Sequence, residues 1–192
     1  MKRACSLCLF SLALMIPLAV RAQDRGDISV FGGYLQAWNA DANQGWNASV
    51  SGTIINHLAL VADFSGLYGS SKYTDSYFKS EDKYRHYKIL FGPRYVHTIG
   101  KRWTPFAHCL VGLEKAGSKG WYTSETTSGS YGPYAGNAFA VAVGGGIDLG
   151  VNNRFSVRAL QFDGVGLMDS GFWGYYVRAS FGAVLHLSKA SE

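Results

Sequence analysis

The sequence predicts an all-β protein, an eight-stranded antiparallel up-and-down transmembrane β-barrel. Three observations support this prediction. Apolar and polar residues alternate through most of the chain. The connecting segments are alternately short and long. The composition is typical of strands. Of 192 residues, 15% are aromatic and 24 are glycine, while only 16% are charged. Aromatic side chains favour a pleated surface, and glycine suits turns, kinks and crowded barrel walls.

Residues 1–22 are predicted to be a secretory signal peptide, and residues 23–192 the barrel domain. Lys2 and Arg3 provide the positive start, an apolar stretch follows, and Val20-Arg21-Ala22 offers small residues at the cleavage positions. An uncleaved anchor helix is the alternative, but the apolar run is at the short end of the ~20 residues that span a bilayer.

Cleavage would change both the charge and the cysteine content. It removes three of the 18 Lys and Arg residues and leaves 15 against 13 acidic residues, so nucleic acid is not expected as a partner. It also removes Cys5 and Cys8. Cys109 remains alone, which excludes an internal disulfide framework.

Eight stretches of alternating residues are expected to form the strands. Each is near or above the ~9–11 residues with which a tilted strand crosses a bilayer. In chain order they are Ile28–Trp38, Trp46–Ile55, Leu58–Tyr68, Tyr84–Val96, Trp103–Lys115, Asn137–Leu149, Arg154–Phe162 and Trp173–Leu187. The seventh does not alternate cleanly, because Arg158 and Gln161 fall on opposite faces. A bulge near Leu160 would bring both to the inside.

The two faces of these strands differ in a way that indicates lipid contact. On the third, fourth, sixth and eighth strands, one face is bulky and apolar. Its members are Leu58, Leu60, Ala62, Phe64, Tyr87, Ile89, Phe91, Pro93, Tyr95, Phe139, Val141, Val143, Ile147, Leu149, Phe181, Ala183, Leu185 and Leu187. A soluble barrel carries such residues inside and Lys, Glu and Thr outside. Here the second face is rich in Gly, Ala and Ser, which fit a crowded lumen, so we expect the apolar face to meet lipid.

The connections between strands support the same interpretation. Residues 56–57, 98–102 and 150–153 are expected to be short turns. Residues 39–45, 69–83, 116–136 and 163–172 are longer, polar and rich in Tyr, Ser, Thr and Lys, and are expected to be exposed loops. Short turns at one end and long loops at the other are typical of membrane barrels.

Eight aromatic residues cluster near the expected strand ends, where an interfacial girdle would lie. They are Tyr34, Trp38, Trp46, Tyr68, Tyr84, Trp103, Trp173 and Tyr175.

Alternation places a set of ionisable side chains inside the barrel. The set is Asp63, Lys88, Arg94, His108, Glu114, Asp148, Arg158, Arg178 and, at the lower rim, His186. The interior of an eight-stranded barrel is barely wide enough for side chains, and a single buried charge is costly. We therefore expect a paired polar network that plugs the lumen. A narrow water-filled conduit is the alternative.

The chain resembles the small eight-stranded outer-membrane β-barrel family, the OmpA-like and opacity-type porin-fold proteins. The motifs that carry the resemblance are VFGGY at Val30–Tyr34, FGPRY at Phe91–Tyr95, PFAH at Pro105–His108, GGGID at Gly144–Asp148, and Arg158 with Gln161 and Asp163. The resemblance implies location in the bacterial outer membrane, contact with its lipid and lipopolysaccharide, and recognition by the barrel-assembly machinery. Ser180, Gly182, Leu185 and Leu187 match the family's C-terminal assembly signal, with Leu187 in place of the preferred aromatic residue and five residues beyond it.

The expected function is structural or surface-binding, with no cofactor and no enzymatic activity. The loop segments Ser70–Arg85 and Gly117–Tyr134 have a composition suited to contacts with an external ligand. A small passive pore is one alternative, and a lipid-modifying enzyme is another. His186 and Ser188 have the spacing of a base and a hydroxyl on one strand face, but no orienting carboxylate is evident nearby, and the other histidines lack metal-ligand spacing.

Overall fold

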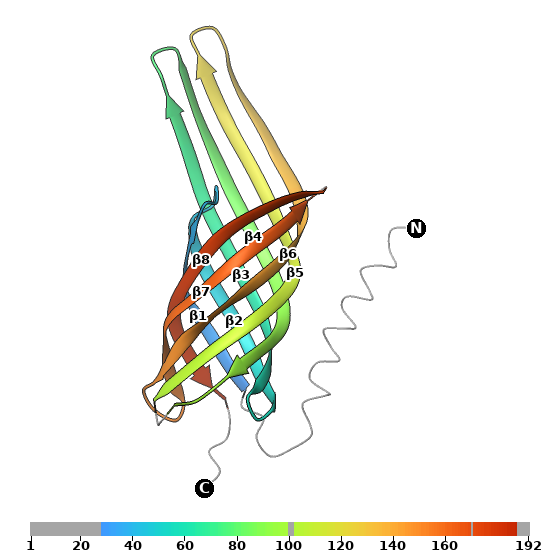
Figure 1. Cartoon of the computed structure of the whole chain (residues 1–192). Helices are drawn as coiled ribbons and strands as arrows, with labels where there is room; N and C mark the ends of the chain where they lie inside the picture. The colour runs from blue at the N-terminus through green and yellow to red at the C-terminus, as the bar shows by residue number, and fades with distance from the viewer. Residues whose placement is uncertain (1–27, 100–101, 170, 188–192) are drawn as a thin grey trace.

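A computed structural model describes residues 28–99, 102–169 and 171–187, so the predicted signal peptide lies outside the described residues. Eight antiparallel strands pair in chain order and close into one barrel (Figure 1). Their bounds are β1 Ile28–Trp38, β2 Gln44–Ile55, β3 Leu58–Thr74, β4 Phe78–Val96, β5 Trp103–Ser124, β6 Ser128–Gly150, β7 Phe155–Asp169 and β8 Phe172–His186. Within these described ranges, no helix is long and apolar enough to cross a membrane. The predicted fold class is confirmed.

Strands β3 to β6 are much longer than the sequence suggested. The expected loops 69–83 and 116–136 are almost entirely strand, and only residues 75–77 and 125–127 connect the paired strands. The expected loop 163–172 is also mostly strand, because β7 extends to Asp169 and β8 begins at Phe172. That prediction was wrong because Ser, Gly and Lys are typical of loops, whereas the interleaved Tyr and Thr residues favour strands once a partner is available. The two extended hairpins project beyond the rest of the barrel (Figure 1).

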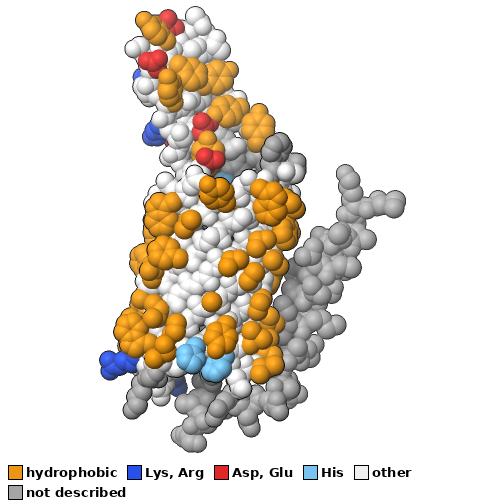
Figure 2. All heavy atoms as spheres, in the orientation of Figure 1, with side chains coloured by type: hydrophobic (Ala, Val, Ile, Leu, Met, Phe, Trp, Pro, Cys, Tyr) orange, Lys and Arg blue, Asp and Glu red, His pale blue; other side chains and the backbone are white. Residues whose placement is uncertain are grey.

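Outward-facing side chains form an apolar belt on the barrel wall. Leu60, Ile89 and Val143 are 54%, 48% and 59% exposed, whereas their chain neighbours Val61 and Leu90 are buried. Figure 2 shows hydrophobic side chains spread over the visible wall, with Asp and Glu only on the part that projects above it. So much exposed apolar surface suits contact with lipid. The alternation of apolar outward and small or polar inward residues is confirmed.

Seven of the eight aromatic residues predicted for the girdle are exposed on the outside. The exception is Tyr84, which is half-buried and packs against the hydrophobic cluster inside the barrel. Its side chain lies inside because Tyr84 shares the inward parity of Lys88 and Leu90 on β4. The prediction for Tyr84 was therefore wrong.

Strand β7 carries the predicted bulge. Its pairing with β8 shifts register between Arg158 and Gln161, and its pairing with β6 shifts between Ile147 and Asp148. As a result Arg158 and Gln161 are each only 1% exposed. From Gln161 onward the odd-numbered residues of β7 point inward, which includes Asp163 and Val165.

The barrel closes where β1 meets β8, and two glycines face each other at this seam. Gly33 pairs with Gly182. A Cβ atom added at Gly182 would lie 2.2 Å from the carbonyl oxygen of Gly32, and one added at Gly33 would lie 2.1 Å from that of Phe181. Backbone on both sides makes these contacts hard to relieve, so the closed seam requires glycine at both positions.

Replacing Gly182 with Val should therefore weaken closure by about 1–3 kcal/mol, the usual cost of overpacking. The Gly32→Val variant is a matched control on the same seam, because a Cβ atom at Gly32 meets nothing within 4 Å. Both variants would be refolded from urea into detergent, without assembly machinery, and scored by heat-modifiable gel migration and urea unfolding. Equal stability of the two variants would contradict the steric explanation.

Candidate functional sites in the lumen and the protruding sheet

Arg178 of β8 is the centre of the polar network inside the barrel. Its Nε donates to Asp163 Oδ2 at 2.8 Å, and its Nη2 donates to Asp63 Oδ1 at 3.1 Å. Its Nη1 donates to Ser65 Oγ at 3.2 Å. All four residues are almost fully buried. One guanidinium therefore connects β8 with β7 and, across the lumen, with β3.

A second arginine extends the network toward the short-turn end. Arg158 holds Asp148 with two bonds, from Nε at 2.8 Å and from Nη2 at 3.0 Å. Its Nη1 donates to Gln161 Oε1 at 2.8 Å, and Gln161 Nε2 donates to Asp163 Oδ2 at 2.8 Å. The fork of an arginine matches both oxygens of a carboxylate, so this pair is geometrically specific. Gln161 joins the two arginine centres into one chain of bonds.

The polar network also includes a second group on the β4–β5 wall, which no described hydrogen bond links to the arginines, and contacts from β5 and β2 to the arginine-bound carboxylates. Lys88 Nζ donates to Glu114 Oε2 at 2.7 Å, and His86 Nδ1 lies 2.5 Å from Glu114 Oε1. His108 Nε2 lies 2.8 Å from Asp163 Oδ1. On the other side, Asn47 Nδ2 donates to Asp63 Oδ2 at 2.9 Å.

Eight of the nine ionisable residues that the sequence placed inside are buried in the structure, and His186, at the rim, is half-buried. Seven of the eight make at least one of the hydrogen bonds or ion pairs described above. Arg94 is different: it stacks on the Phe106 ring at 4.5 Å from the ring centroid, and its Nε and Nη2 have no partner among the described residues.

The bulge expected near Leu160 already brought Gln161 inside, but sequence reasoning did not assign four other members of the network, namely Asn47, Ser65, His86 and Asp163. Asp163 could have been found by continuing the alternation past the bulge in β7. Asn47 and Ser65 have the inward parity of β2 and β3. Because they are uncharged, nothing in the sequence distinguished them from the other inward-facing residues.

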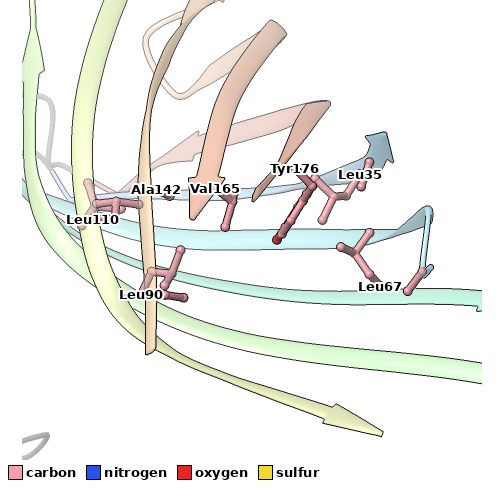
Figure 3. Close-up of a cluster of buried hydrophobic side chains, with 11 residues drawn as sticks. Leu35, Leu67, Leu90, Leu110, Ala142, Val165 and Tyr176 are labelled. Carbon is pink, nitrogen blue, oxygen red and sulfur yellow. The ribbon is translucent and has the colours of Figure 1, made fainter. Parts of the chain in front are cut away.

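A cluster of apolar side chains occupies another part of the lumen. Figure 3 shows Leu35, Leu67, Leu90, Leu110, Val165 and Tyr176 packed in one cluster between the strands. Lys88 Nζ lies 4.9 Å from the centroid of the Tyr176 ring, so the cluster is in contact with the polar network. Both groups together occupy the interior.

The extended parts of β3 to β6 form a four-stranded sheet beyond the barrel, which we call the protruding sheet. It comprises residues 69–74, 78–85, 115–124 and 128–137. Residues paired across strands share a face, and these faces continue those of the barrel below. One face is thus an extension of the barrel's outer wall, and the other looks toward the barrel axis.

The outer face of the protruding sheet is basic. Six exposed cations lie on it, and they are Lys72, Lys79, Lys83, Arg85, Lys115 and Lys119. On the described strands of this face the one carboxylate is Glu81, which lies 3.5 Å from Lys83 Nζ and 4.0 Å from Lys72 Nζ. Lys83 and Lys119 stand directly opposite each other on β4 and β5.

The inner face of the protruding sheet is aromatic. Phe78 stacks on Tyr122 with ring centroids 6.3 Å apart, and it also contacts Tyr73. Tyr131 contacts Tyr134, and its hydroxyl donates to Asp82. These contacts run across all four strands and stiffen the sheet outside the barrel.

The remaining candidate positions lie near the C-terminus. Ser180 is buried, and Gly182 lies at the β1–β8 seam, whereas Leu185 and Leu187 are exposed on the outside. Their role as an assembly signal remains a prediction. His186 Nε2 lies 2.9 Å from Ser156 Oγ, while Ser188 is outside the described residues. The described ranges contain no group of three or more His, Cys, Asp or Glu residues that could hold a metal ion.

A closed ring of eight strands with an apolar outside and a charged inside defines the class of small outer-membrane β-barrels. Among solved structures, the chain is similar to Ail, the attachment invasion locus protein of Yersinia pestis, in complex with the heparin analogue sucrose octasulfate. Identity is 15% over 85% of this chain and 99% of that chain, with a TM-score of 0.52.

A second structure of Ail gives 18% identity over the same shares of the two chains and a TM-score of 0.51. No protein-family model and no curated protein matches the sequence. The likeness to these structures concerns the fold, and it confirms the resemblance to the eight-stranded outer-membrane barrels that the sequence motifs indicated.

Substituting Met for Arg178 should cost about 3–5 kcal/mol of unfolding free energy, because it leaves Asp63 and Asp163 buried beside each other without their cation. Urea unfolding in detergent micelles would measure the change. The Arg154→Met variant, which alters an exposed arginine in a turn, is the control and should change stability little. A loss below about 1 kcal/mol for Arg178→Met would show that the network contributes little to stability.

Proposed function

We propose that this chain is an outer-membrane surface protein that binds polyanionic carbohydrate through the basic face of the protruding sheet. The observation that carries the proposal is the charge of that face, six exposed cations against one carboxylate. A structural barrel needs no such extension, because the ring of strands is already closed below it.

The positions of the cations favour a ligand over a simple solvated surface. Like charges that face each other across two strands destabilise a sheet. Lys83 and Lys119 have this arrangement. Glu81 forms ion pairs with Lys72 and Lys83, but not with Lys119 or Lys115. An anion with several charges would offset the repulsion and at the same time gain from every cation on the face.

The choice of a sulfated or phosphorylated carbohydrate rests on geometry as well as charge. The cations lie on one face of an extended sheet, so a long polyanion could contact several of them along its length. That Ail was crystallised with a heparin analogue supports this choice, since the two chains share the fold. In this proposal the apolar belt contacts outer-membrane lipid and lipopolysaccharide, after export and insertion by the barrel-assembly machinery.

The double variant Lys83→Gln/Lys119→Gln tests the proposal. Each cation near an anionic surface contributes about 1 kcal/mol, so we expect binding to heparin or dextran sulfate to weaken roughly tenfold or more, with a smaller dependence on salt. The control is Arg102→Gln/Arg154→Gln, which removes two exposed cations at the opposite end of the barrel. Equal weakening in both double variants would show that only net charge matters, and unchanged binding would refute the proposed face.

The packed lumen argues against the alternative of a passive pore. Paired charges and the apolar cluster occupy the interior, and the network bonds cross it from β8 to β3. We expect no large, stable conductance steps when the purified protein is inserted into a planar bilayer. Steps of the size seen with open porins would contradict this interpretation of the lumen.

A further inference from the structure

Arg94 presents an unused binding fork inside the barrel. Its side chain is 3% exposed, and its Nε and Nη2 are both buried without a hydrogen-bond partner among the described residues. These are the same two atoms with which Arg158 holds both oxygens of Asp148. A buried donor that is left without an acceptor is costly, and the cost is larger for a charged group.

The buried carboxylates of the lumen are already engaged by other residues. Each of their eight oxygens accepts from, or lies at hydrogen-bond distance of, another side chain. The pairs are Asp63 with Arg178 and Asn47, Glu114 with His86 and Lys88, Asp148 with Arg158, and Asp163 with His108, Gln161 and Arg178. None of these oxygens bonds Nε or Nη2 of Arg94, which leaves the two donors without an acceptor among the described residues.

Among the buried Lys and Arg residues of the described lumen, Arg94 is the one with no carboxylate bonded directly to it. Arg94 and Arg158 lie 4.5 Å and 4.4 Å from the centroid of the same Phe106 ring. Two guanidinium groups thus share one aromatic ring, and Asp148 is bonded to only one of them. A water molecule could accept the hydrogen bonds of Arg94, whereas an anion would in addition pair its charge directly with the Arg94 guanidinium.

His108 supplies a further unpaired group at the same level. It is the direct cross-strand neighbour of Arg94 in the β4–β5 pairing, and both side chains point inward. Its Nε2 contacts Asp163, while its Nδ1 is buried and has no partner among the described residues. In the protonated imidazole, Nδ1 is a donor and can share an anion with the fork of Arg94.

We propose that the Nε and Nη2 of Arg94, together with His108 Nδ1, form a binding site for a small inorganic anion of chloride size inside the barrel. The anion completes the pairing of charges around Phe106. The site is independent of the basic face of the protruding sheet, because it lies in the lumen on different residues.

Bromide, which replaces chloride and scatters anomalously, tests the site directly. Crystals of the detergent-solubilised protein would be soaked in bromide and the anomalous difference map calculated. We expect a peak within hydrogen-bond distance of the Arg94 fork. A map with bromide only at the protein surface, or with a water at this position, would overturn the proposal.

Thermal unfolding gives a second test in solution. At equal ionic strength, chloride or bromide should raise Tm by a few degrees relative to gluconate, which is too large for the site. The Arg94→Gln variant should lose this difference, and Arg154→Gln, an exposed substitution, should keep it. The same halide effect in Arg94→Gln as in the parent protein would refute the assignment. If Arg94→Gln does not fold, the bromide map of the parent protein decides the question.

Discussion

The structure depends on how the charges inside an eight-stranded ring are paired. Such a ring leaves room for side chains but not for bulk water, so each charge that points inward needs a partner on another strand. Arg178 meets this need for Asp63 and Asp163 at once and so connects β8, β7 and β3. Arg158 and Lys88 do the same for their own carboxylates. The ring can therefore close where the inward-facing charges of different strands meet partners of opposite sign.

The strands that form the protruding sheet carry different kinds of outward-facing residues along their length. Within the apolar belt, β4 turns Ile89 outward and Lys88 inward. In the protruding sheet the distribution is reversed, with Lys83 outward and Phe78 and Tyr122 on the inner face. Along β4 the alternation continues unbroken through this change, because period two is a property of the backbone. What changes along β4 is the kind of residue on the outer face, which is apolar in the belt and charged in the protruding sheet.

This explains which features were predictable from the sequence. Period-two alternation placed Asp63, Lys88 and Arg178 inside because it needs no knowledge of the partner strand. The lengths of β3 to β6 were missed because a polar strand and a polar loop have similar compositions, and only pairing with a neighbour distinguishes them. The environment of Arg94 could not be predicted from the sequence either, since it depends on which carboxylates are bonded to the other arginines.

The protruding sheet arises from four neighbouring strands and leaves the other four short (Figure 1). A barrel of eight equal strands would look alike from every direction in the plane of the membrane. This barrel is asymmetric, since the basic face of the protruding sheet points away from the barrel axis, while its aromatic face points back toward that axis. Rotation of the molecule about the membrane normal therefore decides which neighbours can meet each face, so contacts made here have an in-plane direction.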